Sequence, residues 1–104
     1  MKVTEWKSLK QALRESRHED ASMYIEDRRA QNPEHANDCE RLLFHHYNGR
    51  GMWPESFDLA TNSVGGKDVV KGRLRRLKQM MEAWGDQNQA TYGQVVESLA
   101  KLSA

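Results

Sequence analysis

Three side chains with metal-binding chemistry lie close together between residues 35 and 46. His35 and Cys39 are four residues apart, and His46 follows seven residues after Cys39. On a helix this spacing places them near one face, and imidazole nitrogen together with thiolate sulfur is a donor set that binds zinc. A structural zinc site takes four ligands in two close pairs, however, and the sequence offers no second pair. We therefore predict no metal and no cofactor, and we expect Cys39 to be a small buried core residue.

A second group of chemically active side chains is the basic run between residues 67 and 78. Its cations are Lys67, Lys71, Arg73, Arg75, Arg76 and Lys78, against the single acid Asp68. Cations gathered on one helix bind phosphate backbones or carboxylates of a partner protein. The simpler interpretation is a solvated face whose long side chains cover apolar surface. We predict that the partner-binding residues are Lys71, Arg73, Arg75, Arg76 and Lys78, and that Arg73 and Arg76 face outward.

No arrangement of residues typical of an enzyme is recognisable. The sequence lacks the G-x-S-x-G nucleophile motif, and Gly65-Gly66-Lys67 has neither the preceding strand nor the full spacing of a phosphate-binding loop. Most carboxylates alternate with bases along helices, as on an ordinary solvated surface. We therefore predict a protein without enzymatic activity.

The composition indicates a small globular protein. The chain has 104 residues, of which 38% are hydrophobic and 30% charged, and we expect residues 1–104 to form one domain. A net charge of +1 gives no overall field for a polyanion, so a nucleic-acid site would have to be local. One cysteine is typical of a reducing compartment, and no signal peptide or membrane span is recognisable. We expect a cytoplasmic protein that does not enter a membrane.

Two helices between residues 67 and 102 position the basic run. The buried stripe of the first is predicted to consist of Val70, Leu74, Leu77, Met81 and Trp84. Gly85 follows where a left-handed residue ends a helix. After a polar turn, Thr91 and Gln94 form a T-x-x-Q capping box that predicts the start of the second helix. The buried face of that helix is predicted to contain Tyr92, Val95, Val96, Leu99 and Leu102.

Upstream, the spacing of apolar residues predicts further helices and no strand. We expect a helix from Thr4 to about Ser16 with Trp6, Leu9, Ala12 and Leu13 on one face, and a weaker helix that ends near Asn32. A third helix begins at Pro33 and stops at Asn48-Gly49, and a short fourth helix begins at Pro54, with Trp53 in the linker before it. We find no internal repeat. The predicted fold class is all-α, a single compact bundle of five to six helices.

The segment from Leu77 to Leu102 resembles the fourth and fifth helices of death domains, most closely those of Toll-pathway adaptors and kinases. The shared pattern is a hydrophobic pair, a Trp-Gly that ends the helix, a short polar turn and an Ala-Thr before an apolar-periodic helix. Here these are Met80-Met81, Trp84-Gly85, residues 86–89 and Ala90-Thr91. Upstream, Trp53, Phe57, Leu59 and Ala60 stand for the W-x-x-L-A helix of that family. In such a fold an N-terminal helix with Trp6, Leu9 and Leu13 could fill a groove beside Leu99 and Leu102.

The resemblance implies a non-enzymatic protein–protein interaction module. Its charged helix surfaces would meet patches of opposite sign on a protein partner with an acidic surface or on a second copy of the chain. The acidic run Glu19, Asp20, Glu26 and Asp27 is the expected counterpart of the basic helix. The alternative is a small helical nucleic-acid-binding regulator that places residues 67–78 on a phosphate backbone.

Overall fold

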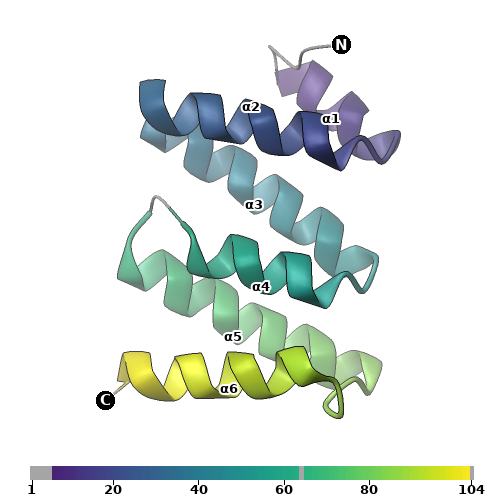
Figure 1. Ribbon diagram of the computed structural model, residues 1–104, viewed down its shortest axis with the longest axis vertical. Helices are drawn as coiled ribbons and strands as arrows, with labels where there is room; N and C mark the ends of the chain where they lie inside the picture. The colour runs from purple at the N-terminus through teal and green to yellow at the C-terminus, as the bar shows by residue number, and fades with distance from the viewer. Residues whose placement is uncertain (1–5, 64, 104) are drawn as a thin grey trace. The chain divides into compact units, whose positions relative to one another are not determined.

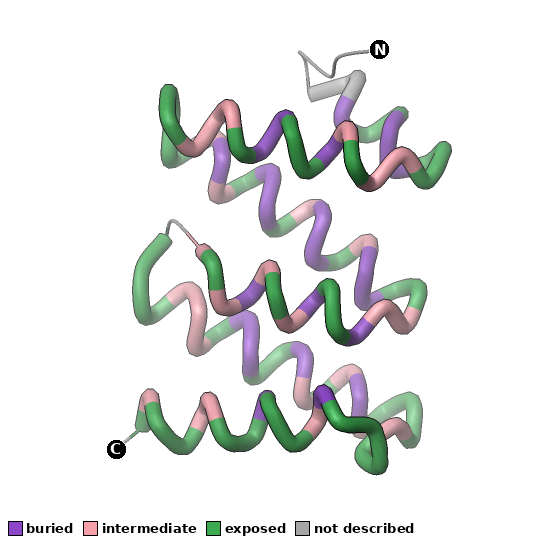
Figure 2. The backbone as a smooth tube through the Cα atoms, in the orientation of Figure 1, coloured by how far each residue is buried: buried purple, intermediate pink, exposed green. Residues whose placement is uncertain are grey.

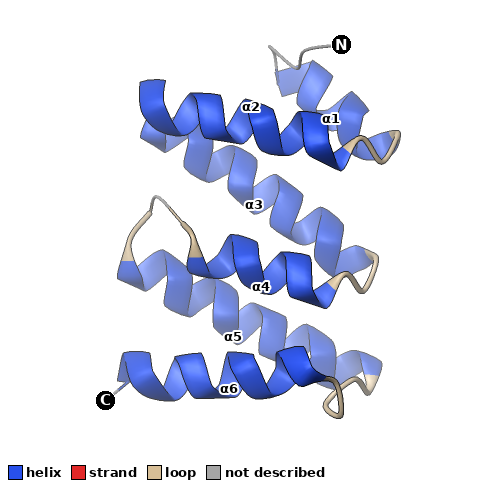
Figure 3. Cartoon of the chain, viewed as in Figure 1, coloured by secondary structure: helices blue, strands red, loops and turns tan. Residues whose placement is uncertain are grey.

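The computed structural model describes the backbone of residues 6–63 and 65–103, and the side chains of residues 9–63 and 65–103. Six α-helices and no strand are present in this part of the chain, and the protein is 83% helical (Figures 1 and 3). The all-α prediction is therefore confirmed. The helices are α1 (Trp6–Arg14), α2 (His18–Gln31), α3 (Pro33–Gly49), α4 (Trp53–Thr61), α5 (Lys67–Trp84) and α6 (Ala90–Ser103). The predicted cap at Thr4 and the side chain of Trp6 lie outside the described residues.

Local backbone chemistry explains why these helices end where they do. Pro33 opens α3, and the side-chain oxygen of Asn32 accepts the backbone N–H of His35 at 3.3 Å, as expected of a helix cap. At the end of α5, Gly85 has a φ of 74°, in the left-handed region. Its N–H donates to the carbonyl of Glu82 at 3.1 Å, and the N–H of Asp86 donates to the carbonyl of Met81 at 2.8 Å. This pair of bonds is a Schellman motif, which closes the helix as the sequence predicted.

The contacts between residues divide the chain into two compact units, Met1–His46 and Tyr47–Ala104. In the first unit α1 packs on α2 and buries Leu9 and Leu13 there. In the second unit α5 packs against both α4 and α6, and α4 also contacts α6 (Figure 1). Leu99 and Leu102 are half-buried; the sequence suggested that an N-terminal helix could fill a groove beside them. That residues 1–104 form one domain stays a prediction.

Buried positions recur along the chain at a spacing of 34 or 35 residues. Two sets of positions 34 residues apart lie in α1, α3 and α5: the first set is Leu9, Leu43 and Leu77, and the second is Leu13, Tyr47 and Met81. Two sets of positions 35 residues apart lie in α2, α4 and α6: the first set is Ala21, Ser56 and Thr91, and the second is Ile25, Ala60 and Val95. All twelve are buried, so the expectation of no internal repeat was wrong. The pair α2–α3 recurs as α4–α5, and such helix pairs of about 34 residues are typical of helical repeat proteins.

The two tryptophans of the second unit exchange the roles that the sequence predicted. Trp53, expected in a linker, begins α4, is 1% exposed and donates its indole N–H to Asp86 at 2.6 Å. Trp84, expected in the core, is 49% exposed and packs edge-on against Trp53, with ring centroids 5.2 Å apart. Trp84 is the last residue of α5, at the end of the apolar stripe.

Helix α6 begins two residues earlier than the capping box predicts, since a cap at Thr91 would make Tyr92 the first helical residue. Because Ala90 is its first residue, Thr91 lies inside the first turn and is buried, so it does not serve as the cap. Val95 is buried as expected, but Val96, the next residue around the helix, is 41% exposed. The predicted buried face of α6 was therefore too wide.

Candidate partner-binding surface on helix α5

The buried face of α5 determines which of its cations reach solvent. Leu74, Leu77 and Met81 are fully buried, as predicted, and Val70 is half-buried (Figure 2). These residues hold α5 against α4 and α6 in the second unit. The cations on the opposite arc therefore face outward.

Arg73 does not belong to the exposed set, and its predicted outward orientation was wrong. It is 7% exposed, and its Nη1 lies 3.4 Å from the carbonyl oxygen of Leu59 on α4. The helical geometry gives the reason: residues four apart differ by about 40° around the axis, so Arg73 lies beside Leu77 on the buried arc. Arg76 differs from Leu77 by about 100° and is exposed, as predicted. Arg73 therefore helps to hold α5 on α4.

Lys78 reaches solvent but has a partner within the protein. Its Nζ lies 2.8 Å from Oε2 of Glu82, one turn later on α5. The same carboxylate accepts the hydroxyl of Tyr92 on α6 at 2.6 Å. The hydrogen bond from Lys78, and after it that from Tyr92, lowers the pKa of Glu82, while the pKa of Lys78 is raised by the same contact. Lys78 therefore contributes to the contact between α5 and α6.

The remaining predicted residues form a cationic surface, which we name the α5 patch and define as Lys71, Arg75 and Arg76. Arg75 and Arg76 are exposed and Lys71 is half-exposed. Within the described part of the chain, none of the three forms an ion pair. The α5 patch thus presents two guanidinium groups whose donors are free to bind an external carboxylate or phosphate.

Most arginines of the first unit are placed differently, the exception being Arg14, which donates to the Gln11 amide oxygen and has no ion pair in the described structure. Arg17 pairs with Glu15 and Asp20, each at 2.9 Å. In the same unit Arg28 pairs with Asp27, Arg29 with Glu26 and Glu40, and Arg41 with Asp38. The ion pair between Arg29 and Glu40 joins α2 to α3, and the Glu40 side chain has no exposed surface. Sequence patterns missed this pair, because its two residues meet only through the packing of the two helices.

The acidic run that the sequence offers as a counterpart is largely neutralised within its own helix. Asp20 pairs with Arg17, Glu26 with Arg29 and Asp27 with Arg28, so that only Glu19 is left without an ion pair in the described structure. These carboxylates already have cations at contact distance. They are consequently poor candidates for binding a second charged surface.

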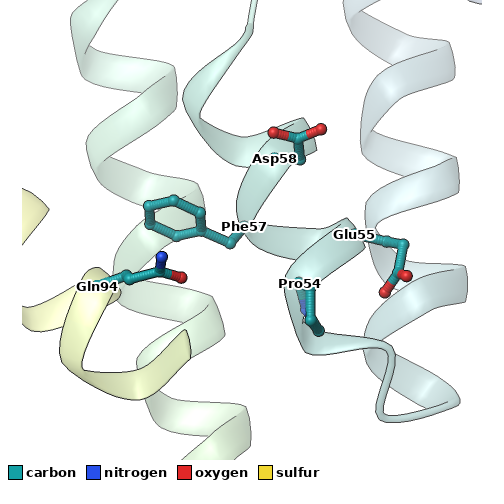
Figure 4. A pocket seen from close by; sticks show the side chains of 5 residues that line it. All are labelled: Pro54, Glu55, Phe57, Asp58 and Gln94. Atoms are coloured by element: carbon teal, nitrogen blue, oxygen red, sulfur yellow. The ribbon is translucent and has the colours of Figure 1, made fainter. Parts of the chain in front are cut away.

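A different pair of carboxylates lies beside a recess in the second unit. Glu55 and Asp58 on α4 are exposed, and neither forms an ion pair among the described residues. With Pro54, Phe57 and Gln94 they line a recess of about 410 Å³ between α4 and α6. Figure 4 shows the Phe57 ring extending toward the Gln94 amide, while the two carboxylates point away from the ring. Sequence analysis missed this recess, although the i,i+3 spacing of its acids places them on one side of a helix.

The histidine and cysteine residues of the first unit contact other side chains. His35 Nε2 lies 2.9 Å from the Tyr24 hydroxyl and 3.6 Å from the Cys39 sulfur, whereas His46 Nε2 lies 2.9 Å from His18 Nε2. Cys39 is fully buried, as predicted, and this burial raises the pKa of its thiol to about 11. Among the described residues, no group of three or more His, Cys, Asp or Glu side chains is arranged to hold a metal ion.

Comparison with known proteins gives no match to a family model, a curated protein or a solved structure. None of the helices in the described residues combines the length and apolar character needed to cross a membrane. Function therefore has to be inferred from the surface of the molecule.

Proposed function

We propose that the chain is a non-enzymatic protein–protein interaction module whose α5 patch binds an acidic protein surface. The observation that carries the proposal is the pair of exposed guanidinium groups, Arg75 and Arg76, with no acid in contact. A guanidinium group presents several donors in a plane and matches a carboxylate bidentately. Charged groups of this kind at a surface accelerate encounter with a complementary partner and select against a wrong one.

The resemblance of residues 77–102 to death domains favours the same class, because those domains meet through charged helix surfaces. The alternative, a nucleic-acid-binding regulator, has less support. Arg73 is buried against α4 and Lys78 is paired with Glu82, so four of the six cations of residues 67–78 are left without these contacts. Fewer phosphate contacts mean a weaker electrostatic contribution to nucleic-acid binding.

The test compares three forms of the full chain in affinity capture from a cell extract. The wild type and the Arg50→Glu variant should capture the same acidic protein, and the Arg75→Glu/Arg76→Glu variant should lose it. Arg50 is the matched control, because it is an exposed arginine of the second unit without an ion pair in the described structure. Since all three positions are exposed, each substitution should change the free energy of unfolding by only about 0.5 kcal/mol.

A second measurement separates the two classes of partner. Each form is run on size-exclusion chromatography with light scattering at low and high salt, with and without a DNA duplex of mixed sequence. The proposal requires the wild type to elute independently of the duplex. Binding that falls log-linearly with salt concentration and is independent of DNA sequence would establish the nucleic-acid alternative and overturn the proposal.

A further inference from the structure

The α5 patch and the recess between α4 and α6 belong to the same unit but cannot meet within one molecule. Helix α5 packs on α4 and α6 through its buried arc, which contains Leu74 and Leu77. Figure 1 shows α4 and α6 on the same side of α5 within this unit. The α5 patch lies on the other arc of the helix. The patch and the recess therefore cannot neutralise each other within this unit.

The chemistry of the recess suits an arginine side chain. Two carboxylates, Glu55 and Asp58, can accept a guanidinium group through paired hydrogen bonds. The half-buried Phe57 ring, from which both carboxylates point away, offers a separate apolar face for the methylene stem of the arginine, and the Gln94 amide adds a further acceptor. A lysine ammonium would satisfy the carboxylates but would lack the planar, bidentate match of a guanidinium group.

We propose that the recess lined by Glu55, Phe57, Asp58 and Gln94 binds Arg75 and Arg76 of a second copy of this chain. This inference rests on the proposed function, because it identifies the acidic partner of the α5 patch. Charge complementarity on the molecule itself supports it: the exposed Arg75 and Arg76 lie next to each other on α5, the exposed Glu55 and Asp58 lie one turn apart on α4, and none of the four forms an ion pair among the described residues. Most of the charges in the first unit, by contrast, are paired.

The arrangement determines the kind of assembly. The patch and the recess are different surfaces, so the contact is heterologous and each copy retains one free patch and one free recess. Such contacts form a closed ring where the rotation between copies closes, and an open chain where it does not. The average mass should therefore increase with protein concentration and should fall as salt screens the charges.

The test is a charge exchange measured by sedimentation velocity at low salt. One variant carries Arg75→Glu and Arg76→Glu, and the other carries Glu55→Arg and Asp58→Arg. Each variant alone presents two surfaces of the same sign, so its self-association should weaken at least about tenfold. In an equimolar mixture every patch again meets a recess of opposite sign. Association should return to within about threefold of the wild type.

The controls fix the interpretation of the charge exchange. Arg50→Glu and Glu19→Arg change exposed, unpaired charges elsewhere and should leave association unchanged. Each variant should keep the helical circular-dichroism spectrum of the wild type. If the doubly reversed recess fails to fold, Glu55→Gln/Asp58→Asn removes the charges with less disturbance and should weaken association as well.

Two results would overturn the inference: a wild type that stays monomeric at every concentration, or a mixture of the two variants that does not associate. A patch variant that associates as the wild type does would also overturn it, since self-association would then use another surface. None of these results decides the proposed function. That proposal fails if reversing Arg75 and Arg76 leaves capture of an acidic protein intact, or if the chain binds a DNA duplex independently of its sequence and with log-linear salt dependence.

Discussion

Replacing Trp53 with alanine should destabilise the protein about twice as much as the same replacement of Trp84. A fully buried tryptophan removes about 200 Å² from water, and at about 25 cal/mol per Å² this corresponds to roughly 5 kcal/mol. Trp53 is 1% exposed and should lose nearly all of this amount. Trp84 is 49% exposed and should lose about half, roughly 2.5 kcal/mol. The edge-to-face contact between the rings is lost in both variants, so it cancels in the comparison.

The measurement is urea unfolding followed by far-ultraviolet circular dichroism, with the slope against denaturant checked for each variant. Trp53→Phe serves as the control, because it keeps most of the apolar bulk and removes only the indole N–H that Asp86 accepts. It should cost less than either alanine variant. If Trp84→Ala lowers the free energy of unfolding as much as Trp53→Ala, the assignment of Trp53 to the core and Trp84 to the surface is refuted.

Three further outcomes are expected. Gly51→Ala should lower the free energy of unfolding by about 1–2 kcal/mol, because Gly51 has a φ of 67° and a Cβ there would lie 2.8 Å from the Trp84 ring. Gly72→Ala should raise it by about 1 kcal/mol, because a Cβ at this position in α5 meets nothing within 4 Å. The Cys39 thiol, with its pKa raised by burial from 9.0 to about 11, should react with iodoacetamide only in urea, and a fast reaction in native buffer would contradict its burial. The pKa of Glu82 is lowered in the folded protein, so its contribution to stability is present above pH 4.5 and is lost as the pH falls through the pKa of the folded state. The difference in free energy of unfolding between the wild type and Glu82→Gln should therefore disappear in acid. A difference that stays constant with pH would refute the contact with Lys78 and Tyr92.

The sequence predicted helix boundaries well where a proline or a glycine determines them, but not at the capping box of Thr91 and Gln94. Pro33 begins α3 and Gly85 ends α5, because the ring of proline and the left-handed freedom of glycine act within a few residues. The stripe of Leu74, Leu77 and Met81 was also predictable, since one helix period places these residues on a single face.

The placement of the other side chains depends on neighbours that periodicity does not describe. Periodicity shows which residues share an arc of a helix, but not where the neighbouring helix ends, and so Trp84 was placed in the core. The misplacement of Arg73 has a different cause. The sequence shows that Arg73 lies only about 40° from Leu77 around the helix, but we expected it to face solvent because it is charged. The 34-residue register was hidden for a third reason. Three of the four sets of equivalent buried positions hold different residues, such as Tyr47 and Met81, so the correspondence is clear only from burial.

The distribution of ion pairs indicates function here better than the number of charges does. A net charge of +1 describes a nearly balanced molecule, yet the balance is reached differently in the two units. In the first unit arginines and acids lie at contact distance from one another, so their fields cancel locally. In the second unit Arg75 and Arg76 lie on the arc of α5 opposite its buried face, and Glu55 and Asp58 lie on α4, so their fields extend into solvent. Under the proposed function, these are the charges that a partner of opposite sign would neutralise.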